Sequence, residues 1–243
     1  MHKKNSLYIY CGYPVEGLGN RLTCLCSGYA VAMIKKKKPY FYWETGHGCR
    51  AEFDDLFKPI EEIKQLKSPP QMEIPKFWAV DFAGGYRNHL KWLESGLNEE
   101  YWRHYRYIAQ KIRLNTKIQS RIPRSSGFIA VHIRMHHWPP SRRQIEKLKN
   151  MKSDKKIFLS TDSKKIYEEL MTDCPNKFWS LSKPTSNEDL GNREIEQQKE
   201  ALVDMFTLCK ADYILTLGKS SSFRNLAVHG YNVPSFKMSD INA

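Results

Sequence analysis

A histidine and an arginine stand one residue apart at the end of an apolar, β-branched stretch. His132 and Arg134 close residues 127–134, which read GFIAVHIR. Such a run is typical of a strand buried on both faces. Because side chains alternate along a strand, the two basic groups leave it on the same side. An arginine there suits a phosphate, since its fork is permanently charged and donates two parallel hydrogen bonds. The other interpretation is an edge strand whose last residues reach solvent.

Polar groups also follow two later predicted strands, at residues 156–160 and 211–216. They comprise Ser160, Thr161, Asp162 and Ser163, with which the first of these strands ends, and Ser220, Ser221 and Ser222 after the second. Ligands of open α/β sheets bind beyond the carboxyl ends of the strands, so we expect these groups to share an edge with Arg134. A fixed cation, a carboxylate and hydroxyls together fit a nucleotide diphosphate. Taken singly, Asp162 or Ser163 also suits a helix N-cap, and the serines suit a loop.

A glycine-containing loop joins the first predicted strand, residues 7–10, to the first predicted helix. The loop carries Gly17 and Gly19, and Asn20 is the expected N-cap of a helix that runs to about residue 36. This arrangement points backbone N–H groups at an anion. Its spacing fits neither the dinucleotide-binding fingerprint nor the P-loop pattern. A tight connection that simply needs glycine explains the loop equally well.

The order of the remaining predicted elements indicates the α/β class. A second strand is expected at residues 40–43, whereas residues 44–87 show little periodicity and no assignable chemistry. From residue 127 onward, strands and helices alternate. The expected strands are 128–133, 156–160, 178–180 and 211–216, and the expected helices are 142–151, 164–171, 194–209 and one from residue 223. Repeated strand–helix units imply a parallel sheet with right-handed crossovers.

The charge of the chain favours an anionic partner. Its 243 residues carry a formal net charge of +13, which is compatible with nucleic acid, a membrane surface or a phosphorylated small molecule. Aromatic and basic residues alternate at 101–107, as in some nucleic-acid stacking surfaces. An amphipathic helix that packs its aromatic side chains is the favoured interpretation of that segment.

The cysteines and the apolar runs exclude several classes of protein. Six cysteines show no paired zinc spacing. Cys24 and Cys26, with His47 and Cys49 downstream, give a weak metal signal, and buried thiols are the favoured interpretation. No apolar run approaches the roughly 18 residues of a membrane span. We therefore expect no metal and no transmembrane segment, and contact with a membrane surface stays open.

Four stretches together resemble the fucosyltransferase superfamily, which includes α1,2- and α1,6-fucosyltransferases, nodulation fucosyltransferases and protein O-fucosyltransferases. They are 17–22 (GLGNRL), 131–134 (VHIR), 158–163 (FLSTDS) and 200–223, where EALVDMF leads through ADYI to SSSF. They occur in the family's order and span most of the chain. The resemblance implies a GT-B-like α/β fold of two Rossmann-like parallel-sheet domains, the N-terminal one reduced. Residues 1–122 would form the acceptor side, and residues 123–243 would bind the nucleotide sugar.

The resemblance also implies an activity. The implied activity is that of an inverting, metal-independent glycosyltransferase, which moves L-fucose, or a related 6-deoxy sugar, from GDP-fucose to a glycan hydroxyl without a cofactor. The alternatives are a basic nucleic-acid-binding protein and a nucleotide-sugar-binding protein without catalysis. The α1,6 enzymes carry two adjacent arginines after the histidine, whereas this chain has Arg134 and Met135, so the subfamily stays open. A cytoplasmic location in a bacterium or virus is expected, unless an N-terminal anchor has been removed.

The family motifs imply roles for individual residues. Arg134 would hold the diphosphate and neutralise its charge, with His132 lining the same site. The remaining donor-binding residues would be Ser160, Thr161 and Asp162 at the guanosine end, Ser221, Ser222 and Phe223 at the phosphates, and Gly17, Gly19 and Asn20 closing from the N-terminal side. Glu16 is the best placed carboxylate for a general base. An exposed loop acid is the other interpretation of Glu16.

Overall fold

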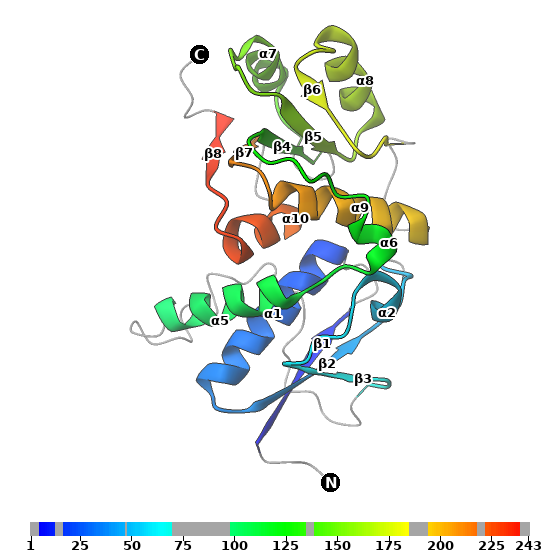
Figure 1. Cartoon of the computed structure of the whole chain (residues 1–243), viewed down its shortest axis with the longest axis vertical. Coiled ribbons are helices and arrows are strands. Elements are labelled where there is room, and N and C mark those ends of the chain that lie inside the picture. The colour runs from blue at the N-terminus through cyan, green and yellow to red at the C-terminus, as the bar shows by residue number, and fades with distance from the viewer. Residues whose placement is uncertain are drawn as a thin grey trace.

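The computed structural model describes residues 5–12, 17–46, 48–69, 98–134, 139–184, 194–217 and 222–238. Within these ranges the chain forms two parallel β-sheets, which lie at opposite ends of the molecule with helices between them (Figure 1). This arrangement is the α/β fold with parallel sheets that the sequence predicts.

The N-terminal sheet has three described strands in the order β1-β2-β3, all parallel. They are β1 (Ser6–Cys11), β2 (Lys38–Trp43) and β3 (Lys64–Leu66). Helix α1 (Leu18–Ile34) connects the first two strands, and the short helix α2 (Phe53–Leu56) precedes the third. Side chains of β1 alternate between buried and partly exposed, because one face of the sheet packs against α1. Strand β3 has only three residues and no apolar run, which explains why the sequence did not predict it.

The C-terminal sheet has the strand order β6-β5-β4-β7-β8, and all four pairings are parallel. The strands are β4 (Ile129–Ile133), β5 (Ile157–Thr161), β6 (Phe178–Trp179), β7 (Tyr213–Thr216) and β8 (Ser235–Lys237). Strand β4 lies at the centre, and all five of its residues are buried. The expectation of a strand buried on both faces is confirmed, and the edge-strand interpretation is wrong. The sequence did not predict β8.

Helices cover both faces of this sheet. Figure 1 shows α7 (Arg142–Asn150) and α8 (Lys164–Asp173) on the outer face, and α9 (Ile195–Leu208) and α10 (Ser222–Asn225) on the face toward α1. Alternate residues of β4 divide between these faces. Val131 and Ile133 join an apolar cluster with α7 and α8, whereas Ala130 belongs to the cluster that includes α9. His132 and Arg134 follow the alternation of Ala130, so they leave β4 on the side of α9 and α10.

The two ends of the molecule meet through a layer of helices. Helix α5 (Asn98–Lys111) packs against α1 and against the π-helix η2 (Leu226–Gly230), and α6 (Thr116–Gln119) packs against α9. Tyr101 and Tyr105 of α5 are buried in this layer, which confirms the amphipathic interpretation of residues 101–107. The two buried rings are therefore not available for stacking on nucleic acid bases.

The largest apolar cluster runs through this layer and does not stop at the expected domain boundary. It includes Leu7 and Phe41 of the N-terminal sheet together with Leu202, Phe223 and Val233 from the C-terminal half. The division at residues 122 and 123 separates the two sheets but not their shared core. That division stays a prediction.

Four of the six cysteines are buried, and the other two are partly buried. Burial raises the pKa of the Cys26 thiol well above its usual range. Within the described ranges, no group of three or more His, Cys, Asp or Glu side chains could hold a metal ion. His47 lies outside the described residues. Among the helices that the structure describes, none is both long enough and apolar enough to cross a bilayer.

Candidate functional site

The carboxyl end of β4 carries the two basic residues with which the sequence analysis began. His132 is buried, and its ring stacks on Phe223 of α10 with the centroids 4.9 Å apart and the planes inclined by 18°. In the sheet, His132 pairs with Ser160 on β5 and with Thr216 on β7. Three strand ends therefore meet at His132, as the sequence predicts.

Arg134 lies beside Asp162 at the same edge. Their strands are in register through Ile133 and Thr161, so the residues that follow emerge next to each other. The Nε of Arg134 is 3.9 Å from Oδ2 of Asp162, and the side chains are 36% and 9% exposed. This separation is longer than a charge-assisted hydrogen bond, which is about 2.7–2.9 Å. Arg134 is thus a partly exposed cation near a mostly buried carboxylate, and among the described residues no other group engages its donors.

Two of the hydroxyl groups at the end of β5 stabilise the turn into α8, and a third lies beside His132. Ser163 caps α8, because its Oγ accepts the N–H of Ile166 at 3.3 Å. The hydroxyl of Thr161 accepts the N–H of Ser163 at 3.2 Å and so shapes the same turn. Of the two caps that the sequence allowed, Ser163 is therefore the one used, and Asp162 is not. The buried Ser160 lies beside His132 on the neighbouring strand.

The start of α1 differs from the sequence prediction. Gly17, in extended conformation at φ −74° and ψ 171°, is the N-cap, and Asn20 lies inside the first turn. The prediction of Asn20 as the cap is wrong, because the Gly17 carbonyl already accepts the N–H groups of Asn20 and Arg21 at 3.1 and 3.2 Å. The helix therefore begins earlier than expected and needs no side-chain cap at this position.

Gly19 brings the two halves of the site together. A Cβ on Gly19 would lie 2.8 Å from the backbone nitrogen of Phe223 and 2.9 Å from the carbonyl carbon of Ser222. Real Cβ atoms do not approach backbone this closely, so only glycine allows α1 to touch α10 here. The first turn of α1 thus abuts the residue whose ring stacks on His132. At Gly17, by contrast, no described residue lies within 4 Å of where a Cβ would be.

Arg21 is a buried residue that the sequence analysis did not select. It is 0% exposed and donates through Nη1 to the carbonyl oxygens of Cys11, at 2.6 Å, and Glu44. Its guanidinium also lies over the ring of Trp43, 5.5 Å from the centroid. These contacts fasten the start of α1 to the carboxyl ends of β1 and β2. Because the carbonyl partners lie far away in the sequence, spacing alone could not reveal this role.

Two further polar residues near the C-terminal sheet were missed. Arg224 donates through Nη1 to the hydroxyls of Thr216, at 2.7 Å, and Ser235, at 2.6 Å, and burial lowers its pKa. Asp204 is buried on α9 and accepts the hydroxyl of Ser182 at 2.6 Å. The available signal for Asp204 was a single carboxylate inside the apolar stretch of residues 201–209. Arg224 gave no such signal.

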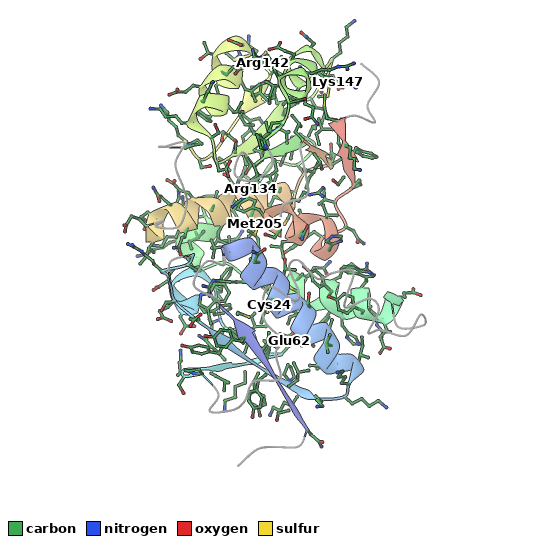
Figure 2. The ribbon with its side chains drawn as sticks, turned by 180° about the vertical axis from the view of Figure 1, so that it is seen from behind. Cys24, Glu62, Arg134, Arg142, Lys147 and Met205 are labelled. Carbon is green, nitrogen blue, oxygen red and sulfur yellow. The ribbon has the colours of Figure 1, made fainter. Side chains whose placement is uncertain are left out.

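Three residues singled out in the sequence, Glu16, Ser220 and Ser221, lie outside the described residues. The other predicted residues form one continuous neighbourhood from the start of α1, through Phe223 and His132, to Arg134 and Asp162. Figure 2 shows Arg134 near the middle of the molecule, whereas Arg142 and Lys147 lie at its outer end on α7. The site therefore occupies the level at which the two halves meet.

Comparisons with known proteins add the identity of the fold. No protein-family model and no curated protein sequence matches the chain. Among solved structures, the chain is similar to NodZ α-1,6-fucosyltransferase co-crystallised with GDP, with a TM-score of 0.62, 20% identity and coverage of 91% of each chain. Fucosyltransferase NodZ from Bradyrhizobium gives a TM-score of 0.59, 18% identity and coverage of 91% and 92%. A mutant of FUT1 from Arabidopsis thaliana in complex with GDP gives 0.60, 12% identity and coverage of 96% of this chain and 70% of that one. At these identities the similarity shows the fold, which is GT-B-like.

Proposed function

We propose that the protein is an inverting, metal-independent glycosyltransferase that moves L-fucose, or a related 6-deoxy sugar, from GDP-fucose to a glycan hydroxyl. The observation that carries the proposal is the partly exposed Arg134 beside Asp162 at the end of the central strand, next to the His132–Phe223 stack. The similar structures, which are NodZ fucosyltransferases and a plant protein with bound GDP, support the same donor.

The proposed reaction breaks the bond between the anomeric carbon of fucose and the diphosphate oxygen. The bonding electron pair leaves with the diphosphate, and the acceptor hydroxyl attacks the opposite face of the sugar while it loses its proton. The diphosphate gains negative charge in this step. Arg134 can neutralise that charge, since its guanidinium is permanently charged and already placed at the strand end. In this proposal the arginine takes the part that a metal ion plays in other transferases.

In this proposal, polar groups at the same carboxyl edge of the C-terminal sheet recognise the nucleotide part of the donor. Asp162 offers a carboxylate to the N–H groups of guanine or to a ribose hydroxyl, with Ser160 and Thr161 beside it. Ser222 and Phe223 lie across from the first turn of α1, where Gly17, Gly19 and Asn20 would close over the phosphates together with Ser221.

Glu16 is the proposed general base for the acceptor hydroxyl. Its support is its place in the chain, because it directly precedes Gly17 at the start of α1. A carboxylate there would approach the donor from the N-terminal half. The acceptor glycan, the division into an acceptor side (residues 1–122) and a donor side (residues 123–243), and the cytoplasmic location belong to this proposal as well.

A nucleotide panel tests the donor assignment. GDP, UDP and TDP would be compared for their effect on the melting temperature of the wild-type protein. At a concentration about 100 times its dissociation constant, a ligand raises the free energy of unfolding by about 2.7 kcal/mol. At this chain length the melting temperature then rises by roughly 5–10 °C. We expect GDP alone to give this shift. Stabilisation by UDP or TDP but not by GDP would overturn the fucose donor.

Turnover of GDP-fucose separates an enzyme from a binding protein. We expect slow release of GDP in water and faster release with an acceptor glycan, measured by quantifying GDP. Binding of GDP-fucose without release of GDP, whichever acceptor is present, would support the non-catalytic alternative. Strong salt-dependent binding to nucleic acid, without a response to GDP, would support the nucleic-acid alternative.

A further inference from the structure

A carboxylate lies at the carboxyl edge of the N-terminal sheet, opposite the proposed donor site. Glu44 directly follows β2, and its backbone N–H donates to the Cys11 carbonyl at 3.2 Å. Its Oε1 accepts the hydroxyl of Tyr10 at 2.6 Å. The carboxylate is thus held by a neutral hydroxyl donor from the neighbouring strand, and the side chain is partly exposed.

Gly12 makes room for this carboxylate. A Cβ on Gly12 would lie 2.3 Å from Cβ and 2.7 Å from Oε2 of Glu44. Both distances are shorter than any real Cβ contact, so only glycine allows the side chain of Glu44 to lie across the end of β1. The absence of a side chain at Gly12 therefore leaves the space that the Glu44 carboxylate occupies.

The first turn of α1 connects Glu44 to the proposed donor site. Arg21 donates to the backbone carbonyl of Glu44 and so fixes this residue to the helix. Gly19, in the same turn, contacts the backbone of Phe223. Glu44 is therefore anchored to the helical turn that meets the C-terminal half. Arg21 binds the backbone of Glu44 and Tyr10 binds its carboxylate, so the carboxylate keeps acceptor capacity for further hydroxyls.

Two tyrosine rings lie next to Glu44 on one face of the sheet. Tyr10 and Tyr42 pair in register, their ring centroids are 5.5 Å apart, and both side chains are partly exposed. The opposite face of β1, with Ile9, packs in the core. Burial, together with Glu44, raises the pKa of both tyrosines, so their hydroxyls stay protonated and can donate. Aromatic rings beside hydroxyl donors and a carboxylate match the apolar face and the hydroxyl rim of a sugar.

We propose that Tyr10, Tyr42 and Glu44 bind the sugar acceptor. The carboxylate of Glu44 accepts hydrogen bonds from acceptor hydroxyls, and the two rings pack against a face of the sugar. This inference rests on the proposed glycosyl transfer and names the part of the N-terminal half that holds its second substrate. Glu44 is a substrate-binding residue in this scheme, and Tyr10 positions its carboxylate.

Glu44→Gln is the principal test, because it keeps the size of the side chain and removes its charge. The chain offers a matched control in Glu62→Gln. Glu62 also accepts a tyrosine hydroxyl, that of Tyr107, at 3.1 Å, but it precedes β3 and so lies near the amino edge of the sheet. Tyr10→Phe is the second variant, since it keeps the ring and removes only the hydroxyl.

The measurement is binding of the GDP-loaded protein to an array of oligosaccharides ending in N-acetylglucosamine, galactose or mannose. Loss of a hydrogen bond to a charged group weakens binding by about 10- to 100-fold, and we expect this for Glu44→Gln. Tyr10→Phe should weaken binding by about threefold to tenfold. Glu62→Gln should match the wild type. Stabilisation by GDP should be equal in all four proteins.

The outcomes separate the two proposals. Equal glycan binding by wild type and Glu44→Gln overturns the acceptor site while leaving the GDP-fucose proposal intact. Failure of the GDP-loaded wild type to bind any glycan on the array also overturns the acceptor site. Loss of GDP stabilisation in Glu44→Gln assigns this residue to the nucleotide or to the fold instead. Absence of GDP stabilisation in the wild type overturns both proposals.

Discussion

The first turn of α1 and the end of β4 each carry an arginine, and the two side chains have opposite surroundings. Arg21 is 0% exposed and donates to backbone carbonyls of its own half. The side chain of Arg134 is 36% exposed and lies 3.9 Å from a carboxylate. The donors of Arg21 serve the connection between strands and helix, whereas those of Arg134 are the ones proposed to meet a ligand. In this proposal stability and chemistry are assigned to different arginines, although both lie at the carboxyl edge of a parallel sheet.

The largest expected effect is on activity, at Arg134. Arg134→Ala removes the cation that meets the leaving diphosphate, so we expect transfer to fall by about 100- to 1,000-fold or more. The melting temperature should stay close to that of the wild type, because the side chain is partly exposed. Initial rates of GDP release and a thermal melt check both statements. Arg143→Ala, at an exposed position on α7, is the control. Retained activity in Arg134→Ala would sink the mechanism.

The next largest effect is on stability, at Arg21. Arg21→Met keeps much of the volume but leaves the carbonyls of Cys11 and Glu44 without this buried donor. The Cys11 carbonyl still accepts the N–H of Glu44, but two hydrogen bonds from a charged donor are lost. Each such bond contributes about 1.5–3 kcal/mol, so we expect the free energy of unfolding to fall by about 3–6 kcal/mol in urea titrations. Unchanged stability together with lost turnover would reverse the assignment of the two arginines.

Gly19 tests the contact that joins the two regions. In Gly19→Ala the new methyl group would meet the backbone of Phe223 at 2.8 Å, and overpacking of this kind costs about 1–3 kcal/mol. We expect lower stability and a higher dissociation constant for GDP, measured by calorimetry. Gly28→Ala is the matched control, because its new methyl group would meet the side chain of Ile9 at 2.6 Å, in the same helix but away from Phe223. It should lower stability and leave GDP binding unchanged. An equal dissociation constant for GDP in the two variants would show that the contact with Phe223 does not matter.

The smallest expected effect concerns pH and the helix layer between the regions. Burial and the nearby Arg224 lower the pKa of His229 below its ordinary 6.5, and its ring stacks on Trp102 at 4.9 Å. As pH falls below about 6.5, the unfolded chain binds the proton first. The stability contributed by the neutral histidine is therefore present above that pH and is lost toward the lower folded-state pKa.

His229→Phe should keep the stack and lose this part of the pH dependence. Urea titrations of both proteins over the acidic range measure the difference. Identical slopes of stability against pH in the two proteins would exclude His229 as their source.

The parts of the fold that sequence could predict are those whose signal is local. The apolar run of β4 and the alternation that places His132 and Arg134 on one side are properties of neighbouring residues. Once the strands are taken as parallel, the juxtaposition of Arg134 and Asp162 follows from the sheet edge. The sequence did not place the short elements α2, α6, β3 and β8, because three or four residues are too few to show a period.

The misses at the site have a different cause. Asn20 suits an N-cap by type, but the cap position was taken by Gly17, whose carbonyl already accepts two N–H groups. The roles of Arg21, Glu44 and Arg224 depend on partners from other elements. Such contacts exist only in the assembled fold, and no spacing within the chain encodes them.

The apolar cluster shared by both halves has a consequence for folding during synthesis on the ribosome. Its members extend from Leu7 to Val233, and chains are synthesised at about 5–20 residues per second. The ribosome therefore needs roughly ten to fifty seconds between the first and the last of these side chains. During that interval the apolar face of the N-terminal sheet and α1 lacks part of its covering. A fragment that ends at residue 122 should therefore aggregate when it is expressed alone.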